Sequence, residues 1–259
     1  MRDNDTWVLK EPIEYFFFDC DSTLSLMEGI DVLATMNQVE AKVHAITERC
    51  MSKTGLTVHD YKQRLNYVKP TRDQIKQLAQ LYEVYCAPGA RETIQVLHDL
   101  GKKVFIISGG IKESIIPFAQ KLGITADRVL AVDVYFDEKG AYQGFDEQSN
   151  LVQANGKALE IAAHHNYQEH SLLVGDGISD WEARKTVTRF VGYAGLQAKE
   201  FVQNHSQFYI TNANLYPILP LGLTDEESTQ LVGEHFAYYL DGLSEIQNDL
   251  VLIREPEDV

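Results

Sequence analysis

The chain has 259 residues, of which 44% are hydrophobic and 24% are charged, as in an ordinary soluble globular protein. Its formal net charge of -15 argues against binding to nucleic acid or anionic membranes, and no stretch is apolar enough to span a bilayer. Three cysteines without C-x-x-C spacing, and an N-terminus without the apolar run of a signal peptide, predict a cytoplasmic protein lacking a disulfide framework and a zinc site.

The N-terminal third combines one strand with a helical segment. The sequence EYFFFDCDST predicts a buried strand that runs into a carboxylate-rich loop. Residues 28–86 contain no convincing strand. Apolar residues recur there at steps of three and four, apart from one wider gap, which is typical of helices: Ile30, Leu33, Val39, Val43, Ile46 and Cys50. Pro70 and Thr71 predict a break and the N-cap of a further helix, so we interpret this segment as a helical insertion.

From residue 87 onward, helices alternate with short apolar strands. Residues 90–100 predict a helix that ends at Gly101, and KKVFIISGG predicts a strand followed by the helix KESIIPFAQKLG, which contains Pro117. VLAVDVYFDEKGAYQGF predicts a β-hairpin with its turn near residues 138–140. After the helix ANGKALEIAAHH come the strands SLLVGDG and RFVGYAG. Strands joined by helical crossovers predict an α/β fold with a Rossmann-like parallel sheet and helices on both faces.

The C-terminal segment after Thr224 is acidic and predicts a helix. Six apolar residues fall on one helical face: Val232, Phe236, Tyr239, Leu243, Ile246 and Leu250. We expect this face to pack against the core. A dimer interface is the alternative, so the chain is expected to be a monomer or a homodimer.

Two carboxylates follow the first predicted strand. Functional groups of a parallel sheet gather beyond the carboxyl ends of its strands, which is where Asp19 and Asp21 lie. One carboxylate can attack a phosphate ester as nucleophile, while the other protonates the leaving oxygen and later activates water. Such clustered charge calls for a cation, and oxygen ligands favour Mg²⁺. Taken alone, the motif is equally compatible with a solvated turn.

Three further motifs support the catalytic interpretation. Ser108 and Gly109 end a predicted strand ahead of a helix, and this arrangement can hold a phosphate group. Lys157 lies near the start of a helix, where its ammonium can meet charge that develops on the phosphoryl group. The strand SLLV leads into Asp176, a candidate metal ligand, and Asp180, which is expected to act in the outer shell of the metal or to hold a lysine.

In this order, the motifs resemble those of the haloacid dehalogenase superfamily of phosphotransferases over residues 14–217, and within it those of the phosphoserine phosphatases. The segments carrying the resemblance are FFFDCDSTLSLMEGID, SGG, GKALEI, GDGISDWEA and RFVGYAG. The resemblance implies a catalytic core at residues 1–26 and 87–223, a small helical cap at 27–86, and a C-terminal helical extension at 224–259 packed on the core. It also implies hydrolysis of O-phosphoserine through a phospho-aspartyl intermediate, with Mg²⁺ on Asp19, Asp176 and the backbone carbonyl of Asp21, and a role in serine biosynthesis.

The resemblance extends to the substrate pocket of the cap. Glu28, Met51 and Arg64 match the residues of that family that contact the substrate. Glu28 can pair with the ammonium group of a serine phosphate, Arg64 with its carboxylate, and Met51 can pack over the short stem. Ser179 stands where the family often has Asn or Thr, and its hydroxyl is expected to serve the phosphate region.

Other functions remain open from the sequence. A related phosphatase with the same cap would act on phosphocholine, phosphoethanolamine or a sugar-like phosphate. Transfer of the phosphoryl group to an alcohol other than water is a further possibility. The alternative from another class is a non-catalytic binding module that has kept the shape of the site. The single expected partner is a small phosphomonoester, with no nucleic acid and no membrane.

Overall fold

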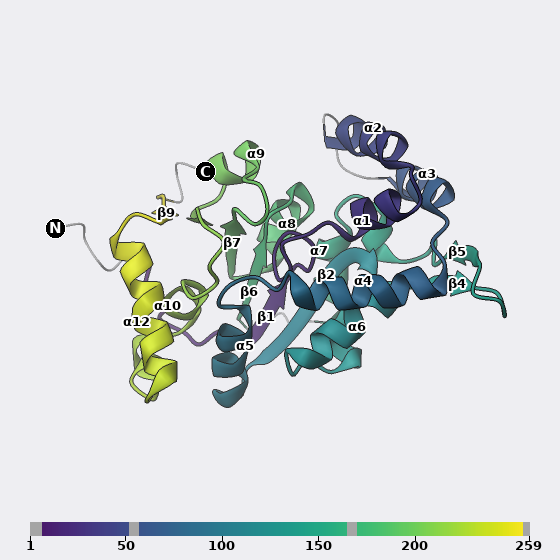
Figure 1. Ribbon diagram of the computed structural model, residues 1–259. Helices are drawn as coiled ribbons and strands as arrows, with labels where there is room; N and C mark the ends of the chain where they lie inside the picture. The colour runs from purple at the N-terminus through teal and green to yellow at the C-terminus, as the bar shows by residue number, and fades with distance from the viewer. Residues whose placement is uncertain (1–6, 52–56, 165–169, 256–259) are drawn as a thin grey trace.

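The structure, a computed structural model, describes residues 7–51, 57–164 and 170–255 (Figure 1). Its centre is a seven-stranded sheet in the order β3-β2-β1-β6-β7-β8-β9, in which only β9 is antiparallel to its neighbour. The strands are β1 (Tyr15–Phe18), β2 (Lys103–Ile111), β3 (Val129–Val132), β6 (Ser171–Gly175), β7 (Arg189–Tyr193), β8 (Phe208–Ile210) and β9 (Val251–Ile253). The predicted parallel α/β sheet is confirmed, whereas β8 and β9 were missed.

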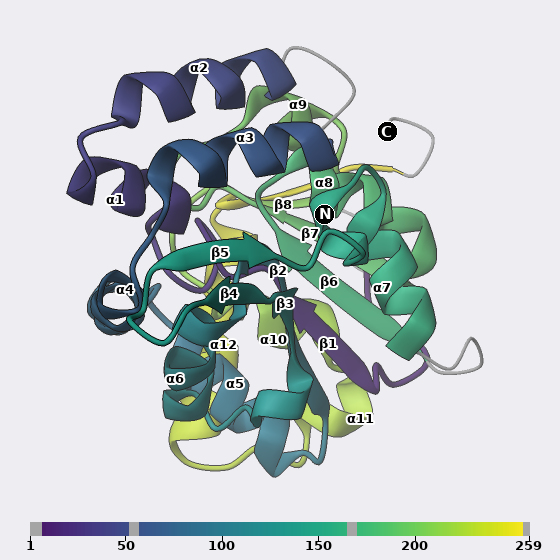
Figure 2. The same ribbon diagram turned by 90° about the vertical axis from the view of Figure 1, so that its right-hand side faces the viewer.

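Helices cover both faces of the sheet. The core helices are α5 (Ala90–Asp99), α6 (Lys112–Lys121), α7 (Gly156–His164), α8 (Ile178–Glu182), α9 (Glu200–Asn204), α10 (Ile218–Gly222), α11 (Asp225–Ser228) and α12 (Glu234–Gln247). Figure 2 shows α7 and α8 on one side of the sheet, and α5, α10 and α12 on the other. Right-handed crossovers place helices on opposite faces of the sheet here. The chain first moves from β1 through β2 to β3, and then moves in the opposite direction from β6 through β7 to β8. Among the described residues, no helix has the length and apolar character to cross a bilayer.

The strand order places a crevice at the centre of the sheet. The chain runs from β1 through β2 to β3 and then returns to β6 on the other side of β1. At such a switch point the loops after neighbouring strands diverge and leave room for a ligand. The loop after β1 is tied to β6, because the Asp19 N–H donates to the Val174 carbonyl at 2.9 Å. The two carboxylate-rich loops therefore meet at one edge.

The predicted helical insertion consists of α1 (Gly29–Met36), α2 (Glu40–Met51), α3 (Val58–Val68) and α4 (Arg72–Val84). The wider gap in its apolar periodicity falls at the turn between α1 and α2, where Gln38 has a φ of 58°. Thr71 caps α4 as predicted, through a hydrogen bond from the Gln74 N–H to its hydroxyl. The division into core and cap at residues 27–86 stays a prediction.

Aromatic contacts join the insertion to the core on both α3 and α4. The predicted hairpin is present as β4 (Val134–Phe136) and β5 (Tyr142–Phe145). It lies under α3, where the rings of Tyr61 and Phe145 are 4.9 Å apart. Helix α4 packs along α6, and there the ring of Tyr82 stacks on that of Phe118 at 6.0 Å.

The C-terminal segment differs from its prediction. It contains α12 and then β9, which pairs with β8 at the edge of the sheet. Tyr239 and Ile246 of the predicted apolar face pack against the core as expected, whereas Val232, Phe236 and Leu250 are exposed, so the face is only partly buried. The helix instead approaches the core at Gly242, which lets its backbone lie against Tyr216. A neighbouring face of α12 therefore points toward the core, and on this face the ring of Tyr238 stacks on the ring of Tyr216 at 5.2 Å.

The close approach at Gly242 generates a stability prediction. A Cβ at this position would lie 2.3 Å from the Tyr216 carbonyl oxygen, so Gly242→Ala must push α12 away from the core. Alanine is better than glycine in a helix by about 1 kcal/mol, but the steric cost should exceed this gain. We expect a net loss of about 1–2 kcal/mol in the free energy of unfolding, measured by urea titration. The control Gln247→Ala, at an exposed site on α12, should change it by less than about 0.5 kcal/mol. Unchanged stability of Gly242→Ala would contradict the packing described.

Candidate active site

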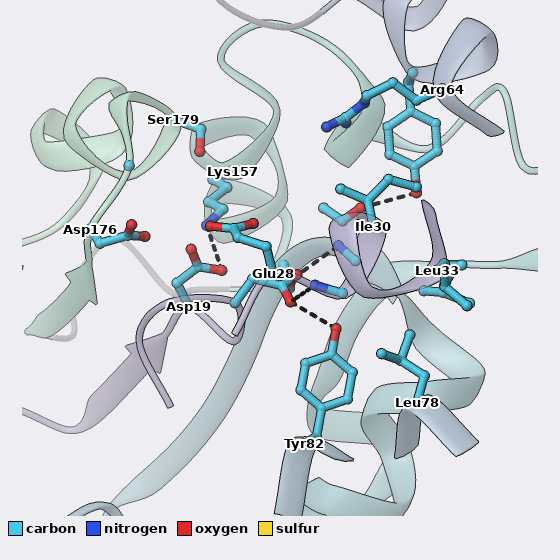
Figure 3. A pocket seen from close by; sticks show the side chains of 18 of the residues that line it. Asp19, Glu28, Ile30, Leu33, Arg64, Leu78, Tyr82, Lys157, Asp176 and Ser179 are labelled. Carbon is cyan, nitrogen blue, oxygen red and sulfur yellow. Dashed lines mark hydrogen bonds and ion pairs between the residues drawn. The ribbon is translucent and has the colours of Figure 1, made fainter. Parts of the chain in front are cut away.

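One cavity lies between the insertion and the carboxyl edge of the sheet (Figure 3). It is lined by nine of the residues predicted from the sequence: Asp19, Asp21, Glu28, Arg64, Ser108, Gly109, Lys157, Asp176 and Ser179. Asp180 is fully buried beneath its floor, in contact with Lys157. Met51 is the last residue of α2, and its side chain lies outside the described part of the chain. The structure thus brings together residues that are far apart in the sequence.

Lys157 links two carboxylates on the floor of the cavity. Its Nζ lies 2.9 Å from Asp19 Oδ1 and 2.6 Å from Asp180 Oδ1, and all three side chains are buried. Burial, and next the Asp180 carboxylate, raise the pKa of Asp19 well above its ordinary value. Burial acts to lower the pKa of Lys157, but the two carboxylates outweigh it and hold that pKa above its ordinary value. The lysine therefore stays charged, next to the oxygen expected to attack phosphorus.

Asp21 has a different environment, although it follows Asp19 on the same loop. Its Oδ1 accepts hydrogen bonds from the Gly29 N–H and the Tyr82 hydroxyl, each at 2.8 Å. Burial, and next the charge of Glu28, raise the pKa of Asp21 to about 7. Asp19 contacts a cation whereas Asp21 accepts from neutral donors. The two carboxyl groups are thereby suited to different tasks, one as a nucleophile and the other as a proton donor and acceptor.

Asp176 faces the same cavity from the end of β6. Its Oδ2 lies 2.7 Å from the Nζ of Lys199, which follows β7. Burial raises the pKa of Asp176 to about 6, although Lys199 acts in the opposite direction. The turn is tight, because a Cβ at Gly175 would lie 2.1 Å from Asp180 Cγ. Only glycine at position 175 leaves room for the Asp180 carboxylate.

These carboxylates fit a divalent cation. Asp19, Asp176 and Asp180 each offer an oxygen, and the three oxygens lie within 4.8 Å of one another. Both oxygens of Asp180 already accept hydrogen bonds, from Lys157 and from the Gly177 N–H at 3.0 Å. We therefore expect Asp19 and Asp176 to contact the metal directly and Asp180 to hold Lys157 in place. A hard cation suits these carboxylates because all of their ligand atoms are oxygens. The carboxylate charges repel one another in a buried site, and a bound cation would offset that repulsion.

The remaining predicted residues frame the cavity. Ser108 is buried in the carboxyl-terminal half of β2, which continues to Ile111, and its hydroxyl accepts a hydrogen bond from the Gly110 N–H at 3.0 Å. Ser179 lies on the rim. Glu28 accepts a hydrogen bond from the Ser22 hydroxyl at 2.7 Å. Arg64 of α3 lies across the cavity from Asp19 and Asp176 (Figure 3), and its buried Nε has no hydrogen-bond partner among the described residues.

Two side chains of the cavity wall that contact the predicted carboxylates, Lys199 and Tyr82, were missed in the sequence. Lys199 would have been found by extending the strand-end rule to the loop after RFVGYAG, since β7 is the neighbour of β6. Tyr82 gives no such signal. It follows Leu78 by one helical turn and reads as part of the apolar face of α4. Its hydroxyl contact with Asp21 arises only when α4 passes the loop after β1.

The ion pair of Lys199 with Asp176 generates a prediction about metal binding. An ammonium and a divalent cation compete for the same carboxylate, so Lys199→Met should tighten cation binding by about tenfold, measured by calorimetric titration. The metal-free variant should also melt at a lower temperature, because Asp176 then remains buried without its lysine. Lys185→Met, at an exposed lysine, is the matched control. Unchanged or weaker binding in Lys199→Met would show that this lysine does not compete with the metal.

Comparison with known proteins agrees with this geometry. Residues 16–184 match the model of the haloacid dehalogenase-like hydrolase family. Phosphoserine phosphatase of Mus musculus is 34% identical over 202 residues, covering 75% of this chain and 88% of the mouse protein. A phosphoserine phosphohydrolase-like protein of Francisella tularensis has a TM-score of 0.68 and 25% identity, covering 76% of this chain and 94% of its own. A substrate-bound phosphoserine phosphatase has the same fold, with a TM-score of 0.67 and 23% identity, covering 81% of this chain and 98% of its own. The family model matches most of the chain, and the carboxylate loops lie at the switch point of the sheet. The chain therefore belongs to the haloacid dehalogenase-like hydrolases.

Proposed function

We propose that the chain is a magnesium-dependent phosphomonoester hydrolase that acts on O-phosphoserine through a phospho-aspartyl intermediate on Asp19. The observation that carries the proposal is the pair of carboxyl groups on one loop. Asp19 contacts the ammonium of Lys157, whereas Asp21 contacts two neutral donors, so one loop supplies a nucleophile and an acid to the same cavity. The 34% identity to the mouse phosphoserine phosphatase supports the substrate.

The proposed reaction has two steps. In the first, an oxygen of Asp19 attacks phosphorus, the bond from phosphorus to the seryl oxygen breaks, and Asp21 gives its proton to that oxygen. In the second, water attacks the acyl phosphate and passes a proton to Asp21, and the bond from phosphorus to Asp19 breaks. The pKa of Asp21, raised to about 7, suits a group that must first donate and then accept a proton near neutral pH.

The phosphoryl group is expected to bind where donors and cations converge. Lys157 and the Ser108 hydroxyl face the cavity, and the Gly109 N–H belongs to the same wall. When bound, Mg²⁺ would be held by Asp19, Asp176 and the backbone carbonyl of Asp21, and it would neutralise charge on the phosphoryl oxygens. Local positive charge is needed here because the chain carries a net charge of -15.

The wall formed by the insertion supports an amino-acid phosphate. Glu28 provides a carboxylate for an ammonium group, and Arg64 provides a guanidinium whose Nε is buried without a partner among the described residues. A buried donor of this kind costs free energy until an acceptor meets it, and the carboxylate of phosphoserine would be such an acceptor. Phosphocholine and phosphoethanolamine have no carboxylate, so Arg64 favours phosphoserine over them. Formation of serine would place the enzyme in serine biosynthesis. Met51, the cytoplasmic location and the choice between monomer and homodimer stay predictions.

Asp19→Asn tests the nucleophile. The amide cannot form the acyl phosphate, so release of phosphate from phosphoserine should fall by roughly a thousandfold or more. In the wild-type enzyme, borohydride added during turnover should reduce the phosphorylated aspartate to homoserine at position 19, read by mass spectrometry. Asp31→Asn is the matched control, because Asp31 lies on α1 outside this cavity. Wild-type turnover by Asp19→Asn would refute the scheme.

Arg64→Ala tests the substrate. Loss of a charge-assisted contact to a carboxylate should raise the KM for phosphoserine by roughly ten- to a hundredfold. The KM for p-nitrophenyl phosphate, which has no carboxylate, should change by less than about threefold. Arg72→Ala, on the exposed side of α4, should leave both values unchanged. Equal effects of Arg64→Ala on the two substrates would show that Arg64 does not bind a carboxylate.

A further inference from the structure

Tyr82 is a buried residue whose hydroxyl contacts Asp21, the proposed acid. Its side chain is fully buried, yet its hydroxyl donates to Asp21 Oδ1 at 2.8 Å. The Gly29 N–H, at the start of α1, donates to the same oxygen at 2.8 Å. These two donors come from different helices, α4 and α1, and they meet on one oxygen of the carboxyl group.

The two donors determine which oxygen of Asp21 can carry a proton. A carboxyl oxygen has two lone pairs, and both of those on Oδ1 are engaged by Tyr82 and Gly29. A proton on Asp21 must therefore reside on Oδ2. That oxygen faces the phosphate-binding wall, since a Cβ at Gly110 would lie 2.9 Å from it and 3.1 Å from Ser108 Oγ. The free oxygen thus points to the side of the cavity where a leaving group would lie.

Tyr82 is itself held firmly in place. Its ring stacks on Phe118 of α6 at 6.0 Å, and its backbone carbonyl accepts a hydrogen bond from the Ser25 hydroxyl at 3.0 Å. The Tyr82 hydroxyl is the donor in its contact with Asp21, because an ionised carboxylate oxygen can only accept. The backbone of α1 packs closely against this hydroxyl, because a Cβ at Gly29 would lie 2.3 Å from it.

We propose that Tyr82 is a positioning residue for the acid–base chemistry, which it serves by fixing Asp21 so that Oδ2 alone exchanges the proton. The inference rests on the proposed function. In the first step, the Oδ2 proton passes to the leaving oxygen as its bond to phosphorus breaks. In the second, a proton of the attacking water returns to Oδ2 as the bond from phosphorus to Asp19 breaks. Tyr82 keeps its own proton throughout.

This role predicts a dependence on the leaving group. The seryl oxygen leaves as an alkoxide unless it is protonated, so its departure needs a well-placed acid. p-Nitrophenolate is a stable anion that can leave without one. Loss of the Tyr82 hydroxyl should therefore slow transfer from phosphoserine but not transfer from p-nitrophenyl phosphate. The later attack of water needs Asp21 as a base with either substrate, so the phospho-enzyme should accumulate.

Tyr82→Phe is the test, because it retains the ring that stacks on Phe118. Single-turnover transfer from phosphoserine should slow by about ten- to a hundredfold. The burst of p-nitrophenolate should keep its rate within about threefold, and more phospho-aspartate should be trapped by borohydride. The matched control is Tyr61→Phe, which removes a buried hydroxyl of the same cavity that donates to the Gly109 carbonyl at 3.0 Å. It should affect transfer from the two substrates equally. Thermal melting of both variants measures any loss of stability.

The outcomes separate the inference from the proposed function. If Tyr82→Phe transfers from phosphoserine within about twofold of the wild-type rate, or slows both substrates equally, Tyr82 does not position the acid. The phospho-aspartyl scheme stands in either case, provided that Asp19→Asn is inactive. If the wild-type enzyme gives neither a burst nor a trapped residue at Asp19, the proposed function itself fails.

Discussion

The structure depends on the contact of one buried lysine with two buried carboxylates. Lys157 lies 2.9 Å from Asp19 and 2.6 Å from Asp180, at the point where the loops after β1 and β6 meet. Carboxylates without such a partner would be protonated or exposed to water, because burial strongly disfavours their charge. The lysine therefore allows two acidic loops to converge at the carboxyl edge of the sheet. The rest of the cavity is arranged around that centre, with the proposed metal ligands Asp19 and Asp176 on one side and Arg64 on the other.

Much of this centre could be predicted because it follows from sheet topology. Asp19 and Asp176 each follow a strand, Ser108 lies in the carboxyl-terminal half of β2, and parallel strands bring their carboxyl ends to one edge. Lys157 was predicted from the order of the motifs along the chain, since its helix alone carries no such signal. The pattern of apolar residues likewise predicted α5, α6, α7 and most strands of the core, whereas the short helices α8, α9 and α10 were missed. Local pattern and strand order together account for these successes.

Other features could not be predicted, because they depend on how elements approach one another. Tyr82 reads as a core residue of α4 until the loop after β1 is placed against it. The inward face of α12 is set by the close approach at Gly242, which periodicity does not show. Strands β8 and β9 have three residues each, too short for a clear alternating pattern. In each case the deciding contact joins residues that are distant in the sequence.

The contact of Gly29 with Tyr82 has a consequence for how sequences of this kind can vary. The hydroxyl of Tyr82 occupies the space that any side chain at position 29 would need. A larger residue at 29 would require a smaller one at 82, and a tyrosine at 82 requires glycine at 29. The two positions lie on different helices and are far apart in the chain, yet position 29 can gain a side chain only if position 82 loses its hydroxyl. Substitutions at position 29 alone should be rare among functional relatives that carry the tyrosine.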